Sequence, residues 1–204
     1  MEETLNFQGN CLYKTNIDYS LSQKEKDYIT NLKYTRFENP GLFLSKDLNV
    51  LDNFLFSNLA KVFNKCVTHY IKNILEIDHD LKLLNSWVTI NKKGGFHDPH
   101  HHPNTFISVC FYLQIKDGGI TFSTQRDPLM NKTNLQLNII NKNLFNSPTV
   151  SFKLSSKDLI IFPGWLAHYG HPNPYNIDRI MVGANYFISG NIGSPENINE
   201  LNLL

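Results

Sequence analysis

The stretch Thr105–Ile115, with the sequence TFISVCFYLQI, predicts a β-strand because β-branched and aromatic residues dominate it, and Gly118-Gly119 then marks a turn. From about residue 82 onwards, other short apolar segments alternate with Gly, Pro and Asn in the same way. They predict further strands over Leu84–Asn91, Ile120–Ser123, Leu135–Ile140, Val150–Leu154, Leu159–Phe162 and Arg179–Ile188. Many short strands joined by such turns are typical of a sandwich, a barrel or a jelly roll.

The stretch before residue 80 has helical patterns instead. Ser22–Glu25, with the sequence SQKE, fits a capping box and predicts a helix over residues 22–34. Asp47 is a candidate cap for a longer helix, because apolar residues recur at helical spacing from Leu48 to Tyr70.

These patterns together predict the organisation of the chain. We expect one domain, residues 1–204, in which a helical N-terminal part (1–80) packs on a β core (82–190). Loops are expected over Asn141–Pro148 and in the tail after Gly190.

Composition and charge exclude several classes of protein. The chain has 204 residues, of which 41% are hydrophobic, and this suffices for one core. Lys and Arg number 19 against 18 Asp and Glu, so a net charge of +1 gives no reason to expect nucleic acid or an anionic membrane as partner. No apolar run approaches the roughly 18–20 residues of a membrane helix, and the polar, acidic N-terminus is not a secretory signal. Three widely spaced cysteines suit a reducing compartment, so we expect a cytoplasmic protein.

Histidines gather in two short windows. Six of the eight histidines lie within residues 97–102 or 168–171. Histidine is the commonest metal ligand because neutral imidazole offers a nitrogen lone pair at neutral pH. In an extended backbone, residues two apart share a face, so His100 and His102 would point one way and His101 the opposite way. The pair can then bind one ion, although a His-rich stretch can also be no more than a surface loop.

The second window follows an apolar strand. Leu159–Phe162 ends in Pro163-Gly164, and His168 comes shortly after it. His171 is more typical of a loop residue than of a ligand. Arg179 opens the next apolar strand. A pair of histidines on one strand, a distant third histidine and a basic residue beyond it together favour a functional site over an incidental histidine cluster.

This combination resembles the non-haem iron(II), 2-oxoglutarate-dependent oxygenases, in particular a group of short members from marine bacteria and their phages. The resemblance spans about residues 85–188. It rests on the order and spacing of Trp87, Asn91, His100–Pro103, Ser108, Phe111–Leu113, Phe162-Pro163, Trp165, His168 and Arg179–Asn185. It implies a double-stranded β-helix, a jelly-roll barrel that holds iron(II) inside its mouth, with the N-terminal helices packed on it.

The resemblance also implies the metal ligands. Most of the superfamily binds iron through His-x-Asp/Glu and a distal His, whereas this chain, like the short group that it resembles, has His-x-His-Pro at that place. The implied ligands are therefore His100, His102 and His168. Three neutral imidazoles carry less charge than a set with a carboxylate, so zinc or nickel can compete with iron for this site. The alternative is that Asp98 supplies a carboxylate beside His100.

Arg179 is implied to bind the far carboxylate of 2-oxoglutarate, since its planar guanidinium can donate two parallel hydrogen bonds. Family members often carry a hydroxyl residue two positions after this arginine, where this chain has Met181. Tyr112, Thr89 or Asn91 are expected to supply hydroxyl or amide contacts instead. Trp87, Phe111 and Trp165 are expected to form walls of the barrel.

The implied activity is oxidation of an unreactive C–H bond, usually to a hydroxyl group, while 2-oxoglutarate is converted to succinate and carbon dioxide. These motifs do not encode the substrate, a small molecule or a protein, which the helices and variable loops would select. Two alternatives stay open: a cupin-type jelly-roll protein or enzyme that binds metal without 2-oxoglutarate, and a non-enzymatic β-sandwich protein with an incidental histidine cluster. A homodimer is also left open.

Overall fold

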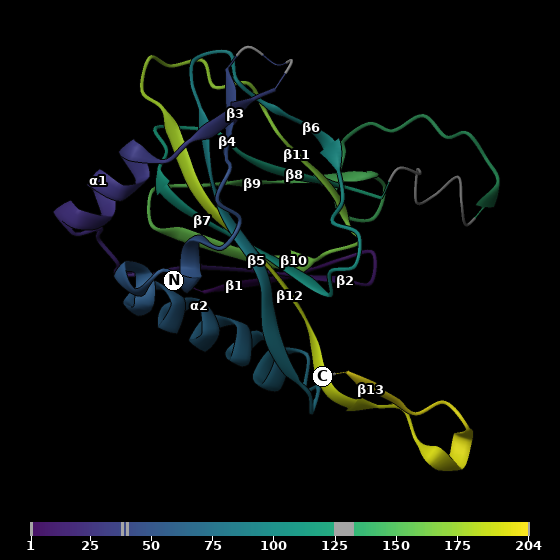
Figure 1. Ribbon diagram of the computed structural model, residues 1–204. Coiled ribbons are helices and arrows are strands. Elements are labelled where there is room, and N and C mark those ends of the chain that lie inside the picture. The colour runs from purple at the N-terminus through teal and green to yellow at the C-terminus, as the bar shows by residue number, and fades with distance from the viewer. Residues whose placement is uncertain (1, 38, 40, 125–132, 204) are drawn as a thin grey trace.

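Two β-sheets face each other in the computed structural model, which describes residues 2–37, 39, 41–124 and 133–203 (Figure 1). The large sheet contains, in spatial order, β1 (Glu3–Phe7), β2 (Asn10–Asn16), β10 (Asp158–Pro163), β7 (Ile107–Gln114), β12 (Arg179–Ile192), β5 (Asp80–Asn91), β4 (Leu42–Ser45) and β3 (Tyr34–Arg36), and β13 (Leu201–Leu203) pairs with β12. The small sheet contains β6 (His97–His100), β11 (Ala167–Gly170), β8 (Gly119–Ser123) and β9 (Thr149–Lys153). The paired strands of both sheets run antiparallel, as the predicted jelly-roll core requires.

The central strands of the large sheet are buried on both faces, which explains their continuous apolar sequences. In β10, Leu159 and Ile161 pack in a core that the large sheet shares with α2 (Ser57–His69), whereas Ile160 and Phe162 pack in a second core with side chains of the small sheet. The side-chain period of two along each strand therefore separates a helix-facing set from a set that faces the barrel interior.

Helix α1 (Gln23–Asn31) begins with the predicted capping box. The backbone N–H of Glu25 donates to the Ser22 hydroxyl at 3.3 Å, and the backbone N–H of Ser22 donates to the Glu25 carboxylate at 2.7 Å. The helix ends three residues earlier than predicted, since Tyr34 already belongs to β3.

The long second helix starts later than predicted. Two short 3₁₀ turns, η1 (Val50–Asp52) and η2 (Phe54–Phe56), precede α2, and a π-helical turn, η3 (Tyr70–Ile74), follows it. Asp47 therefore does not cap α2: its carboxylate accepts from the backbone N–H of Asn49 at 2.8 Å, before the first of these turns. Part of the predicted apolar stripe holds: α2 buries Leu59 and Phe63 against the large sheet, whereas Leu48 lies before the helix and is 48% exposed.

The first 80 residues contribute strands as well as helices, which the sequence patterns do not predict. β2 pairs with β10, and β4 pairs with β5, so both flanks of the large sheet come from this part of the chain. β1, β3 and β4 have only five, three and four residues, and with the longer β2 they lie toward the sheet edges, where the alternation of apolar and polar residues is weakest.

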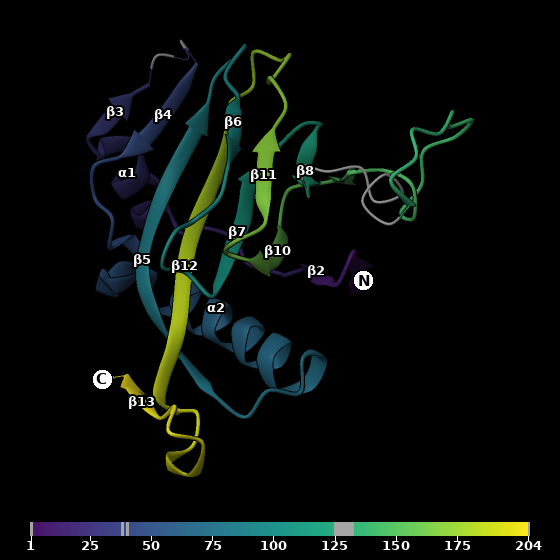
Figure 2. The same cartoon turned by 90° about the vertical axis from the view of Figure 1, so that its right-hand side faces the viewer.

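Two further expectations differ from the structure. The predicted strand Leu135–Ile140 is wrong, because these residues have no regular secondary structure. The tail after Gly190 is not all loop: β12 runs to Ile192 and pairs with β13, and this end projects from the two sheets (Figures 1 and 2). Within the described part of the chain, no helix has both the length and the apolarity that spanning a membrane requires.

Candidate metal and cosubstrate site

Three histidines meet where β6 and β11 pair. His100 lies opposite His168 in the antiparallel register of these strands, and His102 follows β6 by two residues. One ring nitrogen from each of the three side chains lies within 4.8 Å of the others. His101 between them is exposed. This spacing lets three imidazoles contact a single ion at ordinary metal–nitrogen distances.

The hydrogen bonds of the three imidazoles leave the same nitrogen free on each ring. His100 Nδ1 lies 2.7 Å from the backbone carbonyl of Asp98, and His168 Nδ1 lies 3.0 Å from that of Leu166. His102 Nδ1 lies 2.6 Å from Asn185 Oδ1. Each Nδ1 therefore donates, and each Nε2 keeps its lone pair for a ligand bond, the arrangement typical of metal-binding histidines.

The electrostatics of the site favour neutral imidazoles. Burial lowers the pKa of His168 well below its ordinary value, and the neighbouring His100 lowers it further. Burial also lowers the pKa of His102, against the hydrogen bond to Asn185. A proton therefore competes weakly for these nitrogens at neutral pH, and a divalent cation can take its place.

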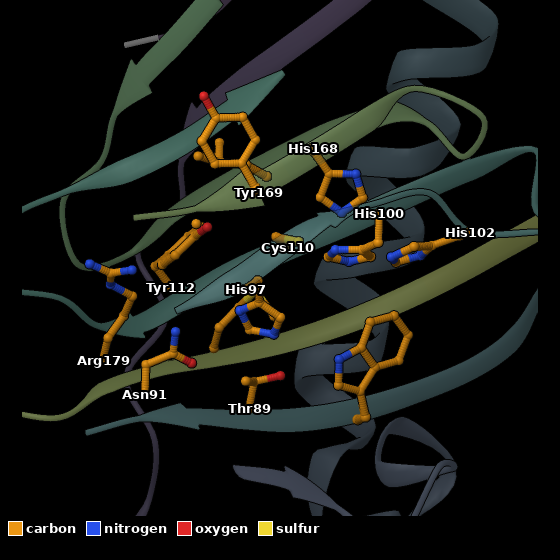
Figure 3. A pocket seen from close by; sticks show the side chains of 14 residues that line it. Thr89, Asn91, His97, His100, His102, Cys110, Tyr112, His168, Tyr169 and Arg179 are labelled. Carbon is orange, nitrogen blue, oxygen red and sulfur yellow. The ribbon is translucent and has the colours of Figure 1, made fainter. Parts of the chain in front are cut away.

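The barrel interior beside the histidines is lined by alternate residues of the large sheet. Trp87, Thr89 and Asn91 of β5 face inward at a spacing of two, as do Cys110 and Tyr112 of β7. Arg179 and Met181 of β12 complete this wall. Figure 3 shows Arg179 at one end of the cavity and the three histidines at the other, with the inward-facing side chains between them.

Arg179 is a buried cation that forms no close ion pair with a described carboxylate, although Asp117 acts on it electrostatically. Its side chain is 6% exposed, and Nη1 donates to the backbone carbonyl of His171 at 2.9 Å. Nε and Nη2 are buried without a hydrogen-bond partner, and the ion pairs found in the described part of the chain do not include Arg179. Burial lowers the pKa of this guanidinium. Two free donors on a buried cation are what a carboxylate ligand would satisfy.

Thr89 offers a hydroxyl near the same place. It is 1% exposed, its Oγ1 has no hydrogen-bond partner, and its register neighbour on β12 is Met181. The hydroxyl that the sequence of β12 lacks at Met181 is thus present on the adjacent strand. Tyr112, also a register neighbour of Met181, and Asn91, which lies opposite Arg179, line the cavity as well.

Asp98 does not join the histidine group in this geometry. Its side chain is exposed, and only its backbone carbonyl contacts His100. Two residues expected in the barrel wall lie elsewhere. Phe111 faces the core under α2, and Trp165 is 58% exposed, with its indole N–H donating to Asn10 at 3.1 Å.

Sequence reasoning missed several cavity residues. His97, Tyr169 and Gly170 line the cavity from β6 and β11, and Cys110 lines it from β7. The signal for Cys110 was available, because it lies between Ser108 and Tyr112 at a spacing of two. For Tyr169 and Gly170 no signal existed, because β11 itself was not predicted.

Comparison with known proteins gives a family and a fold. Residues 85–185 match the model of a family described as "Putative 2OG-Fe(II) oxygenase". No curated protein sequence matches the chain. Among solved structures, SnoN, a non-heme alpha ketoglutarate dependent epimerase from nogalamycin biosynthesis, has a TM-score of 0.62 at 12% identity, over 88% of this chain and 78% of SnoN.

Two further structures are similar over most of both chains. HygX from Streptomyces hygroscopicus, crystallised with nickel, 2-oxoglutarate and hygromycin B, has a TM-score of 0.57 at 13% identity, over 86% of this chain and 82% of HygX. An oxidoreductase of the 2OG-Fe(II) oxygenase family from Burkholderia pseudomallei has a TM-score of 0.56 at 11% identity, over 85% and 83%. At such identities these likenesses establish the jelly-roll fold.

The chain belongs to the 2OG-Fe(II) oxygenase family, since the family match covers about half of it and includes all three site histidines, His100, His102 and His168, together with Arg179. It is accordingly an enzyme of the class that uses iron(II) and 2-oxoglutarate, and both the histidine group and the unpartnered arginine fit these two ligands.

Proposed function

We propose that this enzyme is a dioxygenase that hydroxylates a small molecule and releases succinate and carbon dioxide. In this proposal His100, His102 and His168 hold iron(II) through Nε2. Arg179 holds the far carboxylate of 2-oxoglutarate, and Thr89, Tyr112 and Asn91 line its path. When both are bound, iron(II) and 2-oxoglutarate supply the oxidation of unactivated C–H bonds by molecular oxygen.

One observation supports this proposal above the others: a buried arginine with two unpartnered donors shares a cavity with three convergent histidines. A jelly-roll protein that binds only a metal has no need of a buried cation with two unpartnered donors at the far end of its cavity, because such a group destabilises the fold unless an anion accepts from it. The chain's own residues thus have separate tasks, in which the histidines bind and orient the metal and Arg179 fixes the cosubstrate.

The test is a pair of measurements on protein prepared without a polyhistidine tag. Anaerobic calorimetric titration of 2-oxoglutarate into the iron(II) protein should show saturable, one-to-one binding. Admission of oxygen should then release labelled carbon dioxide from 2-oxoglutarate labelled at its C1 carboxylate, in an amount matching succinate formed. Metal binding without any 2-oxoglutarate binding would favour the cupin-type alternative and end the present proposal.

A further inference from the structure

A second hollow, which we call the outer groove, opens onto the same histidines. It has a volume of about 480 Å³ and is lined on the side of the large sheet by Phe37, Leu42, Leu44, Leu48, Asn85 and Trp87. The groove shares Trp87, His97, His100 and His102 with the cavity described above. A molecule in the outer groove would therefore lie beside the histidine group without occupying the pocket of Arg179.

The outer groove is apolar where it extends the barrel wall. Leu42 and Leu44 of β4 lie opposite Asn91 and Thr89 in the register with β5, so they continue the inward-facing surface of that strand. Phe37 and Leu48 are 45% and 48% exposed. Apolar side chains that remain exposed beside a reactive centre indicate a surface that a ligand covers.

The charges of the outer groove differ from those of the cavity. Among its described lining residues there is no lysine or arginine, and Asp98 at the exposed edge is the one carboxylate. An anionic ligand would find no lysine or arginine side chain to pair with and would meet a like charge at Asp98. A cationic ligand would find no buried carboxylate. The lining therefore favours an uncharged ligand.

Asn85 adds one directional contact. Its side-chain oxygen Oδ1 is buried without a hydrogen-bond partner. Asn85 lies opposite Asn185, the residue whose side chain contacts His102, in the register of β5 and β12. An unpartnered acceptor in an otherwise apolar lining is satisfied by a ligand that offers an N–H or O–H group.

We infer that the outer groove binds the substrate to be oxidised, and that this substrate is an uncharged, largely apolar small molecule with one N–H or O–H donor directed at Asn85. The volume of about 480 Å³ lies in the usual range of small-molecule sites. The inference rests on the proposed function, because it takes the groove as the approach to the iron.

The probe is N-phenyl-1-naphthylamine, an uncharged fluorescent molecule with a single N–H donor, titrated into protein loaded with Zn(II) and 2-oxoglutarate. Its fluorescence should rise to saturation. Phe37→Ala should weaken binding about fivefold or more, because an exposed ring that packs on the ligand is lost. Phe54→Ala is the matched control: Phe54 is 82% exposed and lies outside the groove, so binding should not change.

Two analogues of the probe test its chemical class. 1-Anilinonaphthalene-8-sulfonate has the same rings and a negative charge, and should bind at least about tenfold more weakly. N-methyl-N-phenyl-1-naphthylamine lacks the donor and should bind about fivefold more weakly to the unchanged protein, a preference that Asn85→Ala should abolish. Equal binding of the sulfonate, or a preference for N–H that survives Asn85→Ala, would overturn the inferred class.

Proximity to the metal is measured by replacing Zn(II) with Mn(II), which should broaden the proton resonances of the bound probe. Sharp resonances in the Mn(II) protein, or unchanged binding to Phe37→Ala, would place the probe outside the groove and overturn this inference, while 2-oxoglutarate binding in the same samples would leave the proposed function standing. Loss of 2-oxoglutarate binding in the unchanged protein would remove both.

Discussion

Arg179 has the environment that is hardest to explain without a bound anion. The guanidinium is buried, donates one hydrogen bond to a backbone carbonyl, and leaves two donors unpartnered. Desolvating a charge without a partner destabilises the folded state by several kcal/mol in general terms. Its retention in the barrel is understandable if the working protein holds a carboxylate there.

Replacement of Arg179 tests this directly. Arg179→Ala should weaken 2-oxoglutarate binding at least ~30-fold, the lower end of the roughly 2–5 kcal/mol that truncating a buried charged pair costs. Arg179→Lys should restore only part of the affinity, because a point charge cannot donate two parallel hydrogen bonds. Calorimetric titration checks both values. Iron(II) affinity should stay nearly unchanged, and 2-oxoglutarate binding by Arg179→Ala at the original strength would exclude the assignment.

Gly118 controls the position of Arg179. It has a φ of +113°, and a Cβ built on it would lie 2.7 Å from Arg179 Nη2. Gly118→Ala should therefore displace the guanidinium and weaken 2-oxoglutarate binding about tenfold, by about 1.4 kcal/mol. Gly190→Ala is the control, since Gly190 also has a positive φ, +84°, but nothing lies within 4 Å of its Cβ position. Both variants place a Cβ at a positive φ and should lose stability for that reason, but only Gly118→Ala should lose 2-oxoglutarate affinity, and equal 2-oxoglutarate binding by the two would contradict the prediction.

Single residues differ in how far the sequence could place them. The spacing of His100 and His102 was informative because a period of two is all that an extended strand needs to bring them together. The surroundings of Arg179 could not be predicted in this way, because the neighbours of its side chain come from strands that are far apart in sequence. Asn91 and Gly118 come to lie beside the arginine only after β5, β12 and the turn before β8 have been assembled.

Among the secondary-structure elements, β12 supplies side chains both to the arginine end of the site and to the histidine end. Its inward-facing residues include Arg179 at its start and Asn185 six residues later, so one strand contacts both ends of the cavity. Asn185 Oδ1 accepts from His102 Nδ1 and from the hydroxyl of Ser108 on β7, at 2.6 and 2.8 Å. Since β6 belongs to the other sheet, this contact ties the two sheets together at the histidine group.

Asn185 is therefore a positioning residue for His102, and its replacement should act on the metal. Asn185→Ala should lower metal affinity about 10–100-fold, the usual effect of losing a group that orients a ligating histidine. Asn185→Asp keeps an acceptor for His102 Nδ1 and should retain most of the affinity. Competition titration against a metal-binding dye measures both. Equal affinities for the two variants would show that Asn185 matters only to the packing of β12.

Prediction of the elements followed the strength of the apolar pattern rather than the number of neighbours, because β2, β4 and β11 are also paired on both sides and were missed. β5, β7, β10 and β12 are paired on both sides, and their long apolar or alternating sequences were recognised. β11 is short and interrupted by a register shift between His168 and Gly170, which leaves no periodic signal. Leu135–Ile140 has strand-like residues, but propensity alone does not form a strand without a neighbour to pair with.

In the molecule as a whole, the site lies where the two sheets meet, and its histidines are partly or fully buried there. Burial lowers the pKa of His97 to about 4, with the charges of His100 and Arg179 acting in the same direction, and it also lowers the pKa of His102 and His168. The metal-free protein therefore keeps these imidazoles neutral while the unfolded chain, with an ordinary histidine pKa of about 6.5, takes up protons.

Stability of the metal-free protein should consequently fall as pH decreases below about 6.5, because the unfolded state then binds more protons than the folded state. For His97 the loss continues down to a pKa of about 4, at up to ~1.4 kcal/mol per pH unit for a fully neutral imidazole. Urea unfolding at about pH 7 and about pH 5 measures this loss of stability.

His97→Gln removes one buried imidazole, so its free energy of unfolding should fall by about 1–2 kcal/mol less than that of the unchanged protein over this interval. His101→Gln, which replaces an exposed imidazole one residue after β6, should lose as much as the unchanged protein. If His97→Gln also loses as much, His97 is protonated in the folded state at about pH 5, and the barrel interior is more hydrated than its burial indicates.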